Sequence, residues 1–145
     1  ASAPVNLAAR DRYTGFVCAE MAASRAYKMA GITAKHINVA EVHDCFTIAE
    51  IFAYEGLGFA QPGGGPELIR SKEVYKEGRI PVNLDGGLLS KGHPIGATGG
   101  SQIRTIVLQL RGEAGAIQVK EPTFGLVHNM GGVGIYANIT ILGRE

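Results

Sequence analysis

The chain has 145 residues, of which 46% are apolar and 19% are charged, and its formal net charge is +1. A chain of this length fits one domain, and near-neutral charge without a basic run argues against a disordered or nucleic-acid-binding protein. Two cysteines are too few for a secreted disulfide framework, and there is no signal-peptide pattern and no apolar stretch of about 20 residues. We therefore expect a cytoplasmic chain that does not span a membrane.

The first half of the chain predicts two helices around a short strand. Small and apolar residues recur at helical spacing over 16–30, which predicts a helix. The β-rich run 37–42 predicts a strand that leads directly into a polar segment. Thr47 with Glu50 forms a capping-box pattern, so a second helix is expected over 47–56.

The middle of the chain is dominated by glycine, which accounts for 21 of the 145 residues. Residues 59–92 read mostly as loop, with one short helix expected around 66–77. The glycine-rich loop 92–100 is followed by apolar residues at i, i+3, i+4 and i+7 over 103–110, the spacing of an amphipathic helix. Because glycine lets the backbone turn sharply or approach a ligand closely, this loop at a helix start is a candidate site.

The end of the chain predicts a β-hairpin. Residues 123–128 read as a strand, 129–132 as a turn, and the alternating apolar residues of 133–141 as a half-buried strand. Strand, helix, loop, helix and hairpin together predict an α/β fold in which a mixed sheet packs on helices. We expect residues 1–145 to form a single domain.

His93 in the glycine loop is the first candidate for chemistry. A loop that presents an imidazole beside the unpaired backbone N–H groups of a helix N-terminus is suited to stabilising negative charge on a thioester oxygen. Gly96 allows a ligand to approach closely. The alternative is a tight connection into the helix that binds no ligand, and the loop alone leaves both interpretations open.

Cys45, flanked by His43 and Asp44 after the first strand, is the second candidate. A thiol beside a helix N-terminus has its thiolate favoured by the helix dipole, which suits a proton carrier or a nucleophile. Buried cysteine acting as a small hydrophobic residue is the commoner case. Because successive strand side chains point to opposite faces, His43 and Cys45 should share a side while Asp44 faces away, so a metal site of all three is not expected.

Three segments in this order resemble the C-terminal half of thiolases, in detail the archaeal and sterol-carrier-protein type. They are His43-Asp44-Cys45-Phe46, Gly92-His93-Pro94-Ile95-Gly96-Ala97-Thr98-Gly99 and His128-Asn129-Met130-Gly131-Gly132. The resemblance covers essentially the whole chain. It implies an acyl-CoA acyltransferase that uses coenzyme A thioesters as substrates and needs no further cofactor.

The resemblance also implies roles for individual residues. Cys45 would be the acid/base that handles the proton of the second substrate, replacing the hairpin-turn cysteine of other thiolases. His93 would activate the nucleophile and help bind the thioester oxygen, with His43 near it. The turn from His128 to Gly132 would complete the site, with backbone N–H groups near Gly131 as candidates for a second oxyanion hole.

The resemblance places the cysteine that forms the acyl-enzyme in the N-terminal half, and neither Cys18 nor Cys45 lies in a segment like it; Cys18 reads as a packing residue. The chain also begins at Ala1 without methionine, so we expect a fragment or a processed subunit that associates with an N-terminal thiolase half or with another copy, as a homo- or hetero-oligomer. Two alternatives to the acyltransferase are an aldolase-type subunit acting on coenzyme A esters and a non-catalytic scaffold of the same fold.

Overall fold

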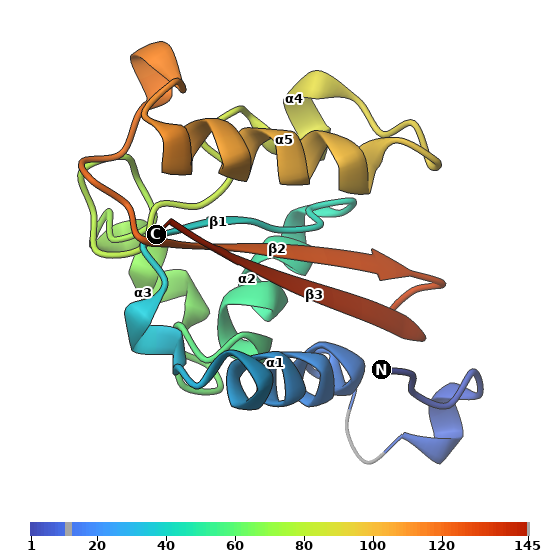
Figure 1. Cartoon of the computed structure of the whole chain (residues 1–145). Coiled ribbons are helices and arrows are strands. Elements are labelled where there is room, and N and C mark those ends of the chain that lie inside the picture. Colours follow the sequence, from blue (N-terminus) through green and yellow to red (C-terminus); the bar gives the residue numbers. More distant parts are fainter. Residues whose placement is uncertain (11–12, 145) are drawn as a thin grey trace.

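A three-stranded sheet lies between two layers of helices in the computed structural model, which describes residues 1–10 and 13–144 (Figure 1). The helices are η1 (Leu7–Ala9), α1 (Val17–Ala30), η2 (Ala34–His36), α2 (Thr47–Gly56), α3 (Gly65–Arg70), α4 (Gly87–Lys91), α5 (Thr98–Arg111) and η3 (Gly115–Ile117). The strands are β1 (Val39–Glu41), β2 (Phe124–Gly131) and β3 (Tyr136–Gly143). Within the described residues, no helix is long and apolar enough to span a membrane.

The sheet is mixed, as expected, and its strands follow the order β1-β2-β3. β1 runs parallel to β2, with Val39 opposite Gly125, and β2 runs antiparallel to β3, from Phe124 opposite Gly143 to Gly131 opposite Tyr136. Because β1 and β2 are parallel, the carboxyl end of β1 lies at the same edge of the sheet as the hairpin turn that follows β2.

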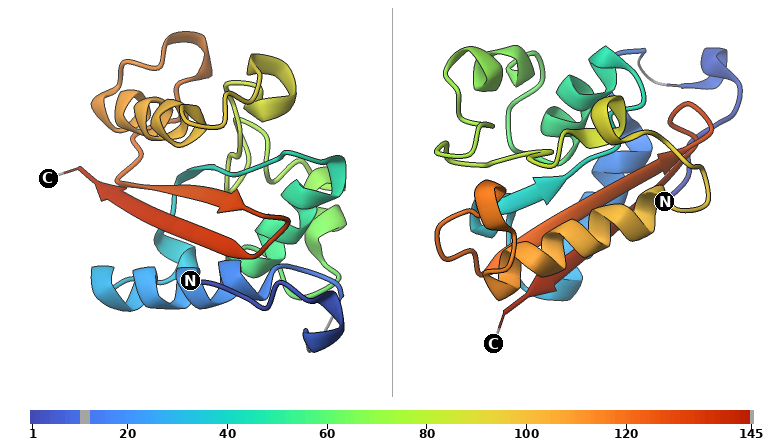
Figure 2. Two further views of the ribbon diagram at one scale, coloured as in Figure 1. Left: turned by 90° about the vertical axis from the view of Figure 1, so that its right-hand side faces the viewer. Right: turned by 90° about the horizontal axis from the view of Figure 1, so that it is seen from above.

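Each face of the sheet is covered by helices, as both views of Figure 2 show. α1 packs on β3, and α2 lies beside α1 on the same face, whereas α5 covers β1 and β2 from the other side. Leu126 is fully buried toward α1 and α2, a contribution of about 1.5–3 kcal/mol for one such side chain. On the other face, a Cβ at Gly125 would lie 2.4 Å from Ile106, so glycine here allows α5 to sit directly against β2.

Two local predictions are wrong in their details. Thr47 does not cap α2: the N-cap residue is Phe46, which makes no side-chain capping bond. Glu50 instead turns inward and accepts a hydrogen bond from Asn83 Nδ2 at 3.3 Å, so it cannot complete a capping box. The helix expected over 66–77 ends at Arg70.

The hairpin turn also lies further along the chain than predicted. β2 continues through Gly131, and the turn occupies residues 132–135 instead of 129–132. Gly132, Val133 and Gly134 all have positive φ angles, of 60°, 52° and 78°. The pairing of β2 with β3 up to Gly131 therefore shifts the turn to the residues with left-handed backbone.

Candidate functional site

The segment after β1 delivers two of the expected site residues to one hollow of about 580 Å³. His43 and Cys45 both line it, whereas the carboxylate of Asp44 points away and accepts a hydrogen bond from Leu88 N at 2.7 Å. The predicted alternation of side chains is confirmed here. The hollow is also lined by Phe16, Phe46, His93, Ile95, Asn129, Met130, Gly131, Gly132, Val133, Tyr136 and Asn138.

His93 reaches the hollow from the loop between α4 and α5, and Thr98 fixes its ring. The Nδ1 atom of His93 lies 2.7 Å from Thr98 Oγ1, and the Thr98 hydroxyl donates to Pro94 O at 3.1 Å. Because the hydroxyl has only one hydrogen, Thr98 Oγ1 accepts from the Nδ1–H of His93. The neutral ring therefore carries its proton on Nδ1 and offers the lone pair of Nε2 as a proton acceptor.

Asn129 of β2 fixes the second imidazole in the same way. His43 Nδ1 lies 2.9 Å from Asn129 Oδ1, and a carbonyl oxygen only accepts, so Nδ1–H is the donor. A Cβ added to Gly99 would lie only 2.6 Å from the amide nitrogen of Asn129. Glycine in the first turn of α5 thus leaves the room that this amide needs.

The two imidazoles contact each other edge to face, with ring centroids 4.9 Å apart and an interplanar angle of 84°. Burial lowers the pKa of His43 below its ordinary value, and the charge of His93 lowers it further. His43 therefore resists protonation while His93 is charged. Side by side, the rings form a site that takes up one proton in preference to two.

Cys45 differs electrostatically from what its place before a helix suggests. Burial raises the pKa of its thiol above the ordinary value, and the negative charge of Asp44 adds to this effect. Backbone N–H groups oppose the shift but do not reverse it. The predicted preference for the thiolate is therefore wrong, and at neutral pH the group is a thiol with a proton to donate.

His128 and Gly96 do not line the hollow. His128 is fully buried within β2, and neither ring nitrogen has a hydrogen-bond partner among the described residues. Burial and the neighbouring His43 lower the pKa of His128 to about 3, so the ring is neutral. Gly96 is exposed in the loop before α5, outside the lining of the hollow.

Two residues of the site, Thr98 and Asn129, were missed as partners of the histidines. Asn129 follows His128 in β2, and alternation puts these two side chains on opposite faces. Which of the two faces the hollow depends on how β2 is aligned with β1, which the sequence does not reveal. Thr98 carried a local signal, because a hydroxyl residue five positions after His93 begins α5 and can reach back over the loop.

Chemically, the hollow offers two imidazole nitrogens as proton acceptors, a neutral thiol as a proton donor, and glycines that expose backbone at the hairpin turn. In the two stretches 1–10 and 13–144, no three His, Cys, Asp or Glu side chains are grouped as metal ligands. General acid/base chemistry on a substrate that enters from solvent is what these groups support best.

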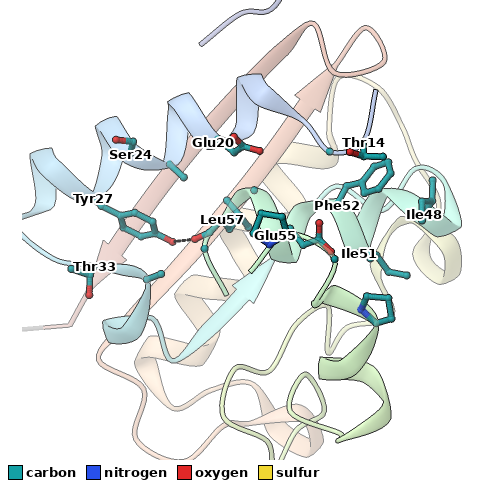
Figure 3. A pocket seen from close by; sticks show the side chains of 18 of the residues that line it. Thr14, Glu20, Ser24, Tyr27, Thr33, Ile48, Ile51, Phe52, Glu55 and Leu57 are labelled. Atoms are coloured by element: carbon teal, nitrogen blue, oxygen red, sulfur yellow. Dashed lines mark hydrogen bonds between the residues drawn. The ribbon is translucent and has the colours of Figure 1, made fainter. Parts of the chain in front are cut away.

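A larger hollow of about 800 Å³ lies elsewhere, between α1 and α2 (Figure 3). Its wall is mostly apolar, Tyr27 crosses it to donate to Leu57 O at 2.8 Å, and its charged lining residues are Glu20 and Glu55. No histidine or cysteine lines it. Since two histidines and a cysteine line the smaller hollow, that one is the candidate site.

Comparison with known proteins identifies one matching family and several similar proteins. The family described as thiolase C-terminal domain-like matches residues 1–144. Acetyl-CoA acetyltransferase of Methanothermobacter thermautotrophicus is 47% identical over 123 residues, which cover 85% of this chain and 32% of that protein. Sterol carrier protein 2 of Homo sapiens is 42% identical over 120 residues, which cover 83% of this chain and 22% of that protein.

A solved structure described as Ltp2-ChsH2(DUF35) aldolase has the same fold. It superposes with a TM-score of 0.81 at 28% identity, covering 93% of this chain and 34% of the other. The predicted α/β fold, with a mixed sheet and a C-terminal hairpin packed on helices, is therefore confirmed. The chain spans about a third or less of the length of these relatives.

Proposed function

The chain belongs to the thiolase C-terminal domain-like family, and from this premise we propose that it supplies the acid/base and oxyanion-binding groups of a thiolase-type acyltransferase acting on coenzyme A thioesters. One observation carries the proposal: His43, Cys45 and His93 line a single hollow, and the two imidazoles are in contact. The name of the archaeal relative, an acetyl-CoA acetyltransferase, supports acetyl-CoA as a substrate.

His93 acts first in this proposal. Its Nε2 lone pair, made available by the Nδ1–H bond to Thr98, takes the proton of an attacking cysteine supplied by the N-terminal part of the enzyme. The Nε2–H formed in that step then donates to the thioester oxygen as negative charge develops on it. His43, held by Asn129, presents an acceptor at Nε2 that can hold a water beside the same oxygen.

Cys45 handles the proton of the second substrate. In cleavage of a 3-ketoacyl thioester, the carbon–carbon bond breaks, the acyl group passes to the nucleophilic cysteine, and the departing carbon takes its proton from the Cys45 thiol. Condensation is the reverse, with the Cys45 thiolate removing that proton. A raised pKa favours the protonated form that cleavage requires.

The hairpin residues complete the proposed site. Gly131 and Gly132 line the hollow without side chains, so their backbone N–H groups are the candidates for holding the second thioester oxygen. Gly96 belongs to the substrate-binding loop in this proposal. His128, buried behind the hollow and neutral, is assigned to the site as an inner support of the catalytic face.

The proposed partner is the N-terminal part of a thiolase, present in the same chain or as a separate subunit. Four large apolar side chains around the hollow are exposed, and such a patch is typical of a surface covered in an assembly. They are Phe46, Ile95, Val133 and Tyr136, with between 59% and 89% of each side chain accessible.

Thiolysis of acetoacetyl-CoA tests the assignment. The chain is assayed together with the N-terminal part of a thiolase, fused or added, and the variants Cys45→Ala and His93→Ala are expected to lose at least about a hundredfold in kcat. Cys18→Ala is the matched control, because Cys18 is a buried residue of α1 that donates to Gly134 O and lies outside the lining of the hollow. Wild-type rates in both site variants would sink the proposed roles.

A second candidate function is that of an aldolase-type subunit that cleaves a carbon skeleton on a coenzyme A ester without an acyl-enzyme. The structural likeness to the aldolase assembly favours it. Iodoacetamide separates the two, since only the thiolase reaction needs a cysteine nucleophile. The N-terminal part is alkylated alone and then combined with this chain, so that Cys45 keeps its thiol; activity that survives alkylation supports the aldolase, and activity that is abolished supports the acyltransferase.

A further inference from the structure

Side-chain contacts hold both ends of the short helix α4, and the residues that make them lie close in sequence to His43 and His93. The helix spans Gly87–Lys91, lies on the α5 side of the sheet and leads directly into Gly92 and His93 (Figure 1). A five-residue helix has little stability of its own, so tertiary contacts must hold it in place. The contacts that do so come from β1, from the segment that follows it, and from Asp85 just before α4.

Asp44 holds the N-terminal end of α4. Its Oδ1 accepts from Leu88 N at 2.7 Å and its Oδ2 from Leu89 N at 3.4 Å, and the side chain is buried. The approach is so close that a Cβ on Gly87 would lie 2.2 Å from Asp44 Oδ2. This capping carboxylate lies 44 positions away from the N–H group it satisfies, and it is the residue next to His43.

Lys91 holds the C-terminal end. Its ammonium group pairs with Asp85 and lies 3.4 Å from Glu41 Oε2. Asp85 is itself fixed by Thr105 Oγ1 at 2.8 Å and by Gly87 N at 3.0 Å. Burial and the nearby Asp85 raise the pKa of Glu41 to about 8, so Glu41 is mostly protonated at neutral pH and Asp85 balances the charge of Lys91.

These contacts connect the two histidine-bearing segments at matching positions. Glu41 lies two residues before His43, and Lys91 lies two residues before His93, so the contact between Lys91 and Glu41 joins the two backbones just behind the paired rings. We propose that α4 is a brace in which Asp44 and Lys91 act as positioning residues that hold His93 against His43.

A role of the brace in acid/base catalysis rests on the proposed function. Its role in holding the two rings together does not, because the contact between the rings can be measured in the chain without any turnover. A displacement of about 1 Å in such a site can cost roughly a hundredfold in rate. From a centroid separation of 4.9 Å, the same 1 Å weakens a proton–proton cross-relaxation signal about threefold, through its inverse sixth-power dependence on distance.

The experiment compares Lys91→Met with Lys91→Arg in the 145-residue chain by NMR of the histidine ring protons. Methionine keeps the apolar stem and removes the charge, whereas arginine keeps a cation that can pair with Asp85. Lys120→Met is the control, since Lys120 is exposed. We expect the His43–His93 cross-peak to weaken about threefold or more in Lys91→Met and the titration midpoint of His43 to rise toward its ordinary 6.5, with both unchanged in the other two.

Removing Lys91 leaves Asp85 partly buried and unpaired, which can unfold the chain. The double variant Asp85→Asn/Lys91→Gln removes both charges together. If Lys91→Met does not fold, the same cross-peak is measured in this double variant instead. A folded variant with the wild-type cross-peak and His43 titration overturns the brace. A weakened cross-peak upholds it even if thiolysis is never observed, so its failure is distinct from failure of the proposed function.

Discussion

Replacing Thr98 by valine should weaken the preference of neutral His93 for the tautomer with its proton on Nδ1. Thr98 is 3% exposed, and its Oγ1 is the hydrogen-bond partner of His93 Nδ1 at 2.7 Å. Valine has the same shape but no hydroxyl, so the Nδ1–H form loses its acceptor while the ring remains in place. The backbone carbonyl of Pro94 also loses a donor.

The size of the effect follows from that one hydrogen bond. A net contribution of about 1 kcal/mol corresponds to roughly a fivefold change in the ratio of the two neutral tautomers. The fraction of His93 with a free Nε2 lone pair then falls, and in the assembled enzyme the rate of acyl-enzyme formation should fall by a similar factor of about five. Thr98→Ser keeps the hydroxyl and should keep both properties.

Long-range proton–nitrogen NMR spectra of the neutral ring measure this ratio directly, because a protonated nitrogen and a lone-pair nitrogen resonate far apart. The spectra are recorded for wild type, Thr98→Val and Thr98→Ser in alkaline buffer. An unchanged Nδ1–H fraction in folded Thr98→Val would refute the role given to this hydroxyl.

Three further predictions concern stability, each measured by urea unfolding. Gly87→Ala should lower the free energy of unfolding by more than about 1 kcal/mol, because the residue has a φ of 62° and its Cβ would collide with Asp44. Gly100→Ala in α5 has open space at its Cβ and should not destabilise the chain. Equal losses in the two variants would contradict this reasoning. The folded-state pKa of Glu41, about 8, lies above its ordinary 4.5, so its contribution is complete below pH 4.5 and is lost as pH rises through 8; Glu41→Gln should flatten that decline. The pKa of His128 is lowered from 6.5 to about 3, so its contribution is complete above pH 6.5 and is lost as pH falls through 3; an acid-side slope that persists in His128→Leu would contradict the burial argument.

Local patterns in the sequence were sufficient for the elements with a regular apolar period. The spacing over 16–30 and 103–110 predicted α1 and α5, and the alternation near the end predicted the β-hairpin. In each case, the residues that determine the element lie within it. The common side of His43 and Cys45 was also predicted from the alternation of a strand, although both residues lie just beyond the end of β1.

Features that depend on distant residues were not predictable in this way. α4 is capped by Asp44, 44 positions from Leu88, so no local capping signal precedes it. The protonation preference of Cys45 depends on how much of the folded chain buries the thiol, which outweighs the effect of the adjacent helix. The contact between His43 and Asn129 depends on the alignment of β1 with β2.

The central claim is that this chain supplies the groups that move protons in a thiolase-type reaction, and hydrogen exchange tests it most directly. The chain is combined with the N-terminal part of a thiolase and incubated with acetyl-CoA in deuterium oxide, and deuterium in the acetyl group is followed by mass spectrometry. We expect Cys45→Ala to abolish exchange while an acetylated cysteine still forms on the N-terminal part, and His93→Ala to prevent that acetylation. Exchange at the wild-type rate in Cys45→Ala would contradict the account.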